Sequence, residues 1–275
     1  VRIVHSHNVI GNSSGSLGRR GYIILARALL RMFATGAIAP SAASLEDLIG
    51  EGWRADPRWR VLPCGIDLAP FRAPIGEMSS RAALRIPADA LVLGSVGRLT
   101  AEKNSEFLLD VLAAVLRVRP DAYLLLIGDG PLREQLERKA QEGGYRDHLV
   151  LPGQRSDVPA LLRNVMDVFV FPSPPPPRGN EALGIAVVEA QAAGLKCVIS
   201  DGLPPEAILI PGLVVQIRSD AGAEKWAEMV IKQAARGDSE AGAGALAVIE
   251  KSEHNRAINV KTLAALYRGA VPANT

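Results

Sequence analysis

From residue 90 onward, short apolar runs that favour strands alternate with segments of helical period. The apolar runs cover residues 91–96, 122–127, 149–151, 168–171, 197–200 and 213–217. Between the first two runs, residues 107–116 place apolar side chains on one helical face, and Pro120 then ends the helix. This alternation is typical of a parallel, doubly wound α/β sheet. The pattern therefore predicts a Rossmann-like domain over residues 73–254.

The first 72 residues carry fewer such patterns. They offer strand-like runs at residues 3–7, 36–40 and 60–63 and a helix at residues 17–33. A nucleotide-binding half of this type usually has about five or six strands, so we expect the first three or so to be absent from this sequence. The opening at Val1, directly in a strand-like run, leads us to expect a start inside a longer protein. Residues 255–275 predict a final amphipathic helix that packs back toward the N-terminal part.

Length and composition exclude several classes of protein. The 275 residues are 48% hydrophobic, which is enough for one large or two small cores. The longest apolar runs have the length of strands, whereas a membrane-spanning helix needs about 20 apolar residues. Cys64 and Cys197 lack metal-ligand spacing, which favours a reducing cytoplasm over a disulfide framework or a zinc site. The net charge of +2 is too small to indicate a nucleic-acid partner.

The segment between residues 19 and 60 is locally basic, with seven arginines against four acidic residues. Scattered arginines of this kind are most often a solvated surface. The alternative is peripheral contact with phospholipid head groups at the inner face of the membrane, or with an anionic acceptor.

Loops that follow strands are the places to look for a ligand site, because ligands of open α/β sheets lie beyond the carboxyl ends of the strands. Arg98 and Lys103 follow the first run in GRLTAEKN, where two cations are placed to bind a diphosphate. Ordinary solvated side chains are the alternative. After the second run, the GDG sequence predicts a tight turn that brings the backbone of Gly128 close to a ligand. Plain turn chemistry explains it equally well.

The strongest constellation follows the fourth run, where Gly184 stands between Glu181 and Glu189 and is predicted to open a helix. Eight residues at helical rise separate the two carboxylates by about 12 Å. This spacing suits contacts with a sugar ring and a ribose diol, and the amides of Leu183, Gly184 and Ile185 would receive the diphosphate between them. A capped helix with two surface glutamates is the alternative. It suits Glu181 better than Glu189, which stands among apolar residues and needs a partner.

Four segments stand together in a recognisable order: VGRLTAEKN, LLLIGDGPLREQL, VLPGQRSDVPALL and EALGIAVVEAQAAG. In this order they resemble the retaining GT-B glycosyltransferases of family four (glycosyl transferases group 1) of bacterial polysaccharide biosynthesis. VLPCGIDLAPF resembles the inter-domain signature, and the match is close over residues 61–218. The resemblance implies a GT-B fold of two Rossmann-like domains. Residues 1–72 would be a truncated remnant of the acceptor-side domain, and residues 73–254 would bind the nucleotide sugar.

The activity implied by the resemblance is the transfer of a hexosyl group, with retention, from a UDP- or GDP-sugar to a polysaccharide or lipid-linked acceptor. It implies a cytoplasmic enzyme with no cofactor and no metal. Arg98 and Lys103 would bind the diphosphate, Glu189 the ribose, and Glu181 would lie near the donor sugar and take part in catalysis.

The resemblance also implies a base site and a catalytic histidine. The loop of residues 154–158, with Arg155 and Val158, would border the base. In HSHN, His7 stands at the end of the first strand-like run and His5 lies on the same face, and we prefer His7 as the more exposed of the two. Without the resemblance, a histidine at a strand end is more often an ordinary surface residue.

The sequence departs from the family pattern at several positions. Cys64 replaces the usual asparagine, Ala182 replaces a glycine, and Gly184 stands where proline is frequent. The proline run of residues 174–177 predicts a stiff, extended loop that reshapes the donor-sugar pocket. The absence of an Asp-x-Asp pair argues against a metal that bridges the diphosphate.

Two alternative functions remain open. A sugar-nucleotide epimerase or a phosphorylase shares the fold. A nucleotide-sugar binding module without turnover belongs to a different class, and we expect this chain alone to bind nucleoside diphosphate without appreciable transfer. GxGxxG and P-loop motifs are missing, which disfavours dinucleotide oxidoreductases and P-loop enzymes.

Overall fold

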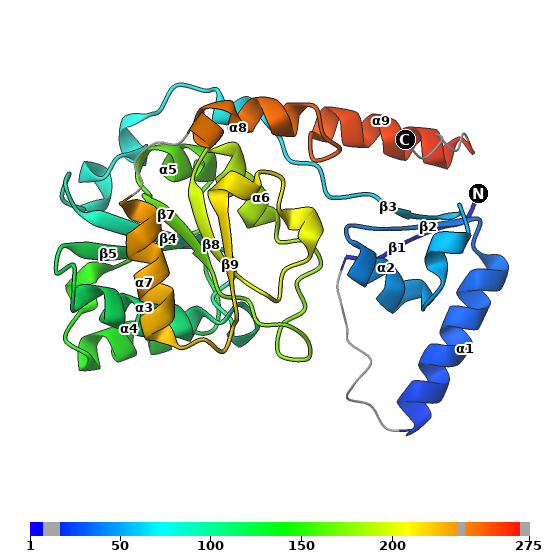
Figure 1. Ribbon diagram of the computed structural model, residues 1–275, viewed down its shortest axis with the longest axis horizontal. Coiled ribbons are helices and arrows are strands. Elements are labelled where there is room, and N and C mark those ends of the chain that lie inside the picture. Colours follow the sequence, from blue (N-terminus) through cyan, green and yellow to red (C-terminus); the bar gives the residue numbers. More distant parts are fainter. Residues whose placement is uncertain (8–16, 236–239, 270–275) are drawn as a thin grey trace.

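The computed structural model describes residues 1–7, 17–235 and 240–269, which form two α/β parts joined by a connecting segment (Figure 1). The smaller N-terminal part holds a parallel sheet in the order β1-β2-β3. The larger C-terminal part holds a parallel sheet in the order β6-β5-β4-β7-β8-β9. The strand order of the larger sheet reverses between β4 and β7, so loops at their carboxyl ends diverge and leave a crevice for a ligand.

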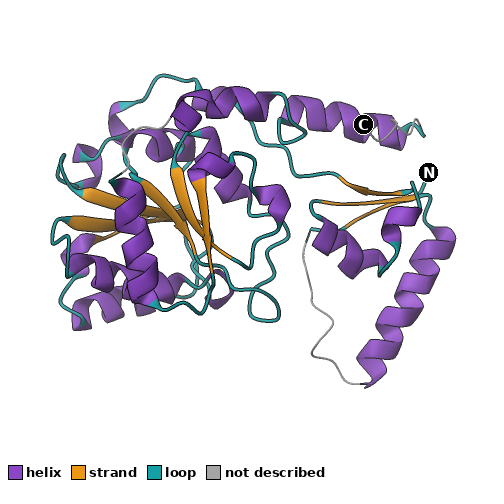
Figure 2. Cartoon of the chain, in the orientation of Figure 1, coloured by secondary structure: helices purple, strands orange, loops and turns teal. Residues whose placement is uncertain are grey.

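The strands of the larger sheet lie where the apolar runs predict them. They are β4 (Leu91–Val96), β5 (Ala122–Ile127), β6 (Leu149–Gly153), β7 (Val168–Phe171), β8 (Lys196–Ser200) and β9 (Val214–Ile217). Only β6 runs two residues past the predicted end, because Gly153 still pairs with Ile127 across a register shift. The near-continuous apolar character of these strands follows from their position, since helices cover both faces (Figure 2).

Alternate residues of each strand enter two separate cores. The helices of the C-terminal part are α3 (Ser105–Leu116), α4 (Arg133–Glu142), α5 (Val158–Asn164), α6 (Ile185–Ala192), α7 (Ala223–Ala234) and α8 (Glu240–Glu250). One face of the sheet packs against α5, α6 and α8, with Phe169 and Ile199 among the buried residues. The other packs against α3, α4 and α7, with Leu93 and Trp226 fully buried. This double cover is the doubly wound arrangement that the sequence predicts.

The N-terminal part has its own small core. Its strands are β1 (Ile3–His5), β2 (Gly36–Ala39) and β3 (Trp59–Val61), and its helices are α1 (Leu17–Phe33) and α2 (Ala42–Ile49). Leu45 and Ile49 of α2 pack with Trp53 and Trp59 in a cluster separate from the larger cores. The prediction that β1 extends to His7 is wrong: pairing with β2 ends at His5, where the neighbouring strand turns away toward α2.

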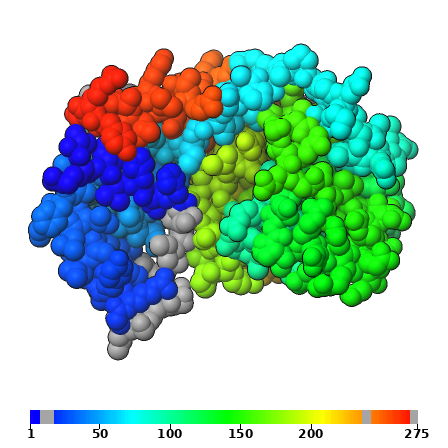
Figure 3. Space-filling model, turned by 180° about the vertical axis from the view of Figure 1, so that it is seen from behind, coloured from blue at the N-terminus to red at the C-terminus, as the bar shows by residue number. Residues whose placement is uncertain are grey.

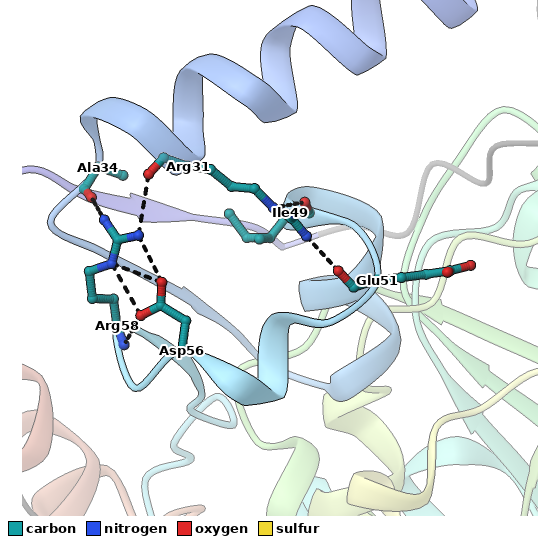
Figure 4. A network of polar contacts seen from close by, with 6 residues as sticks. All are labelled: Arg31, Ala34, Ile49, Glu51, Asp56 and Arg58. Carbon is teal, nitrogen blue, oxygen red and sulfur yellow. Dashed lines mark hydrogen bonds and ion pairs between the residues drawn. The ribbon is translucent and has the colours of Figure 1, made fainter.

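Arginine side chains of the basic segment join α1 to the rest of the N-terminal part. Arg31 donates to the carbonyls of Ile49 and Glu51 at the end of α2, and Arg58 donates to the carbonyls of Ala34 and Arg31 at the end of α1 (Figure 4). Carbonyl groups at the end of a helix have no partner within the helix, and cations suit this negative end of the helix. At these positions the arginines cap the ends of helices.

The two parts are linked by two crossings of the chain that run side by side. Ile66 forms a parallel bridge with Asn255, and its N–H donates to the carbonyl of His254 at 2.7 Å. The return crossing leads into α9 (Arg256–Tyr267), which lies along the N-terminal part (Figures 1 and 3). There the Tyr267 hydroxyl lies 2.8 Å from Nε2 of His5. Domain bounds at residues 72 and 254 stay a prediction.

Among the described helices, none is both long enough and apolar enough to span a bilayer.

Candidate functional site

Two loops that follow neighbouring strands meet at the switch point of the larger sheet. Lys103 ends a 3-10 helix (Ala101–Lys103) after β4, and Glu181 lies in the loop after β7. The Lys103 ammonium forms an ion pair with Oε2 of Glu181 and lies 5.7 Å from the centroid of the Phe171 ring. The side chains are 24% and 12% exposed, so the pair is largely shielded from solvent. The structure therefore brings together two of the predicted site residues.

Glu181 also forms a hydrogen bond at the start of the helix that follows it. Its Oε1 accepts the N–H of Gly184 at 3.0 Å, and α6 begins at Ile185, directly after Gly184 as predicted. Gly184 has φ +83°, which proline cannot adopt and which strains any other side chain, and a Cβ there would lie 2.7 Å from the end of the Leu203 side chain. Because Glu181 to Gly184 is not helical, the spacing of about 12 Å drawn from helical rise does not apply here.

Glu189 occupies the second turn of α6, between the fully buried Val188 and Ala190. Burial raises the pKa of its carboxyl group above the ordinary value. Within the described part of the chain, its carboxylate forms no ion pair or hydrogen bond. A partly buried carboxylate without a partner is costly when ionised, and hydroxyl donors from a ligand would relieve that cost.

Arg98 and the GDG turn lie at the same edge of the sheet. Arg98 is exposed in the loop after β4. Gly128 has φ +136°, and a Cβ there would lie 2.0 Å from the carbonyl oxygen of Gly97, while one at Gly130 would lie 2.4 Å from that of Leu99. The glycines are thus required by close packing of two neighbouring loops. The predicted approach to a ligand is not needed to explain them.

The loop after β6 carries its own ion pair. Arg155 donates through Nε and Nη2 to the two oxygens of Asp157, each at 2.7 Å, and α5 begins at Val158. The Ser79 hydroxyl donates to the same carboxylate at 2.5 Å. Together these donors lower the pKa of Asp157 to about 2, with Arg155 as the main cause. A cavity of about 610 Å³ borders this loop, lined in part by Arg155 and Asp157.

The two histidines lie at the edge of the N-terminal part. Their rings stack with centroids 6.1 Å apart, and the His5 ring also contacts Tyr267. Partial burial, and then the neighbouring His7, lowers the pKa of His5. His7 lies two residues beyond β1, next to residues outside the described range, and is exposed.

The proline run differs from the extended loop that the sequence predicts. After Pro175 the chain turns at residues 176–178, and the Gly179 N–H donates to the Pro175 carbonyl at 3.2 Å. Gly202 lies so close that a Cβ there would be 2.5 Å from the carbonyl oxygen of Ser173. The turn keeps this loop near the loop after β8.

Two polar residues near the site were not singled out from the sequence. Gln191 of α6 is completely buried, and Glu206 reaches from the loop after β8 to the N-terminus of α2. For Gln191 the available signal was a second polar residue, after Glu189, in a mainly apolar helix; Glu206 carried none.

Residues 77–235 match the family described as Glycosyl transferases group 1. The chain belongs to this family. A protein of Bacillus subtilis named EpsF, and described as a glycosyltransferase, is 35% identical over 240 residues, covering 86% of this chain and 60% of EpsF. An alpha-1,3-galactosyltransferase of Escherichia coli, which uses UDP-Gal and GlcNAc-diphosphoundecaprenol, is 32% identical over 146 residues, or 51% of this chain and 36% of its own. The chain thus spans about 60% of EpsF.

Solved structures confirm the GT-B fold predicted from the resemblance. Anabaena HepE in complex with UDP aligns with a TM-score of 0.79 at 22% identity, covering 97% of this chain and 72% of HepE. The sucrose-phosphate synthase of Thermosynechococcus elongatus aligns with a TM-score of 0.73 at 21% identity, covering 99% and 68%. At these identities the likeness concerns the fold alone.

Membership in the group 1 family does not by itself assign roles to side chains. The roles given to Arg98, Lys103, Glu181, Glu189 and His7 remain predictions. In the described ranges, no group of three His, Cys, Asp or Glu residues is placed to hold a metal ion. Lys103 is tied to the loop that leads into α6 by its ion pair with Glu181, and Arg98 lies in the same loop after β4 as Lys103.

Proposed function

We propose that this chain binds a nucleoside diphosphate sugar at the switch point of the larger sheet, as the donor site of a retaining glycosyltransferase. The observation that carries the proposal is the meeting of Lys103, Glu181 and the Gly184 amide at the start of α6. A cation and a helix N-terminus within one small region suit the negative charge of a diphosphate, and the shielded carboxylate beside them can accept hydrogen bonds from sugar hydroxyls.

The diphosphate would lie between the α6 N-terminus and the Lys103 ammonium, with Arg98 closing the exposed side. Lys103 is held in place by Glu181, so little side-chain entropy would be lost when it also contacts phosphate. Glu181 would then lie beside the sugar, where its carboxylate can accept hydroxyl hydrogen bonds.

The nucleoside would extend along α6 toward Glu189 and the loop of residues 154–158. Ribose hydroxyls would donate to the Glu189 carboxylate, which the structure leaves without a partner among the described residues. The ion pair of Arg155 and Asp157 keeps the loop near Val158 in one conformation for the base.

A UDP-sugar is the donor we propose first. HepE binds UDP and the galactosyltransferase of E. coli uses UDP-Gal, although other relatives use GDP-mannose. A glycan or a lipid-linked sugar is the proposed acceptor, because the E. coli relative uses GlcNAc-diphosphoundecaprenol. His7, beyond β1, is the proposed catalytic residue of the acceptor side.

Calorimetric titration with uridine, UDP and UDP-glucose tests the donor site. We expect Glu189→Gln to weaken all three ligands by a similar factor, since each carries the ribose, with the effect growing as pH rises through the raised pKa of the native carboxyl. Glu181→Gln should mainly reduce the preference for UDP-glucose over UDP. Unchanged uridine affinity in Glu189→Gln, with UDP binding intact, would remove the ribose assignment.

Release of UDP from UDP-glucose, with and without added acceptor, then separates a transferase from a module that only binds.

A further inference from the structure

Gln191 ties a loop of the C-terminal part to the helix of the proposed donor site. Its Nε2 donates to the carbonyl of Ala207 at 2.7 Å, and its Oε1 accepts the N–H groups of Leu209 and Ile210, each at 2.9 Å. The side chain is completely buried on α6, two residues after Glu189. One amide therefore fixes the segment 207–210 to the helix that carries Glu189.

Glu206 stands at the start of that segment and reaches the other part of the molecule. Its Oε1 accepts the N–H of Ala42 at 2.7 Å, at the first residue of α2. Ser41 caps the same helix from its own side, because its hydroxyl accepts the N–H of Ser44. The first amides of α2 are thus satisfied by one acceptor from each part, and a carboxylate is the favoured charge at this end of a helix.

Glu206 lies beside His254, at the place where the chain crosses between the two parts. Its Oε2 is buried without a hydrogen-bond partner among the described residues, and so is Nε2 of His254. Burial lowers the pKa of His254, while Glu206 opposes that shift. The carbonyl of His254 accepts from Ile66 in the parallel crossing. Arg60 forms a further ion pair at this crossing, with Glu253 at 3.8 Å, and the Glu253 side chain is 37% exposed.

We propose that Gln191 and Glu206 are positioning residues that couple the donor-site helix α6 to the N-terminus of α2. The connection runs from α6 through Gln191 to the segment 207–210 and from Glu206 to Ala42. A ligand that orders α6 then also orders α2, and a well-seated α2 favours the ligand by the same factor. Group transfer between two domains depends on such positioning. The nucleotide part of this idea rests on the proposed function, whereas the contact itself does not.

Hydrogen exchange of α2 amides in the ligand-free chain tests the contact. Glu206→Ala should speed exchange over residues 43–49 by roughly 10- to 100-fold, which corresponds to loss of one hydrogen bond to a charged group. Glu206→Gln, which keeps an acceptor, should recover part of the protection. Glu253→Gln is the matched control and should leave α2 unchanged.

Ala42→Pro removes the same bond from the opposite side. Proline is tolerated at the first position of a helix, and Ser41 has the extended backbone (φ −147°, ψ 162°) that proline requires before it. Combining Ala42→Pro with Glu206→Ala should add nothing further, because both changes remove one interaction. Additive effects, or unchanged exchange in Glu206→Ala, would overturn the proposal.

Addition of UDP tests the coupling. UDP should slow exchange over residues 43–49 in the native chain, and Gln191→Leu should lose that response and weaken UDP affinity by no more than the factor by which UDP slows exchange in the native chain. Gln233→Leu, another buried glutamine of the same part, should keep the response. A native chain that binds UDP with no change in α2 contradicts the coupling. A chain that does not bind UDP contradicts the proposed function instead, and the ligand-free measurements still decide the contact.

Discussion

The two parts of the molecule place their charged side chains differently. In the C-terminal part, Lys103 and Glu181 pair at the ends of strands, where the larger sheet opens. In the N-terminal part, Arg31 and Arg58 donate to backbone carbonyls at helix ends (Figure 4). The larger part is stabilised by two apolar cores and by structural ion pairs such as Arg155 with Asp157, and it also holds the shielded pair of Lys103 and Glu181 at its open edge. The smaller part has few buried residues and uses its charges to hold helices together.

The largest effect should come from the core of the C-terminal part. Trp226 is fully buried on α7, with its ring 5.6 Å from that of Phe107, so Trp226→Ala should cost about 3–5 kcal/mol of unfolding free energy there. Hydrogen exchange of β4 and β5 should accelerate accordingly. Exchange of β2 should stay as in the native chain because its core is separate.

Leu45→Ala is the reciprocal change, since Leu45 is completely buried in the N-terminal core. It should accelerate exchange in β2 and spare β4. If either substitution accelerates both sheets equally, the parts unfold as one unit and the comparison between them fails.

Lys103→Ala should have the next largest effect, and on binding. Loss of a charged contact to phosphate costs about 1.5–3 kcal/mol, or roughly 10- to 100-fold in UDP affinity. Uridine, which lacks phosphate, should be affected far less. Lys139→Ala is the matched control, because Lys139 pairs with Asp110 on the surface of the same part. An equal loss for uridine would mean that Lys103 acts on the fold or on the base rather than by binding phosphate.

Acid should weaken the C-terminal part through Asp157. Its pKa in the folded chain is about 2, below the ordinary 3.8, so its stabilising effect is present above pH 3.8 and is lost as pH falls toward 2. Allowing for solvent screening, the effect is about 1–2 kcal/mol. Asp157→Asn should therefore be destabilised at pH 7 and converge on the native chain near pH 2, as measured by urea unfolding. A difference that does not depend on pH would show that shape, not charge, matters at this position.

The sequence predicts the larger sheet well because its strands are buried on both faces and leave long apolar runs. It also predicts the helix after Gly184, since a glycine before an apolar helical segment is a local signal. It does not predict that Lys103 contacts Glu181, because 78 residues separate them and only the strand order brings their loops together. The glycines at 128 and 130 were expected to bring the backbone close to a ligand; the structure explains them by close packing against the neighbouring loop, and contact of Gly128 with a ligand stays a prediction. Glu206 and Ala42, 164 residues apart, left no local pattern.

The smallest effect concerns the basic segment and distinguishes its two explanations. Arg31→Met keeps the aliphatic part of the side chain but removes the hydrogen bonds to Ile49 and Glu51, which should cost about 1 kcal/mol. Exchange of α2 should accelerate, while UDP affinity stays the same because the donor site lies in the other part. Arg20→Met, an exposed change on the same helix, is the control and should alter neither. If Arg31 instead faced anionic lipid, Arg31→Met would weaken binding to phosphatidylglycerol vesicles and leave exchange in α2 unchanged. The same two measurements on one variant therefore decide whether this arginine caps a helix or serves a membrane surface.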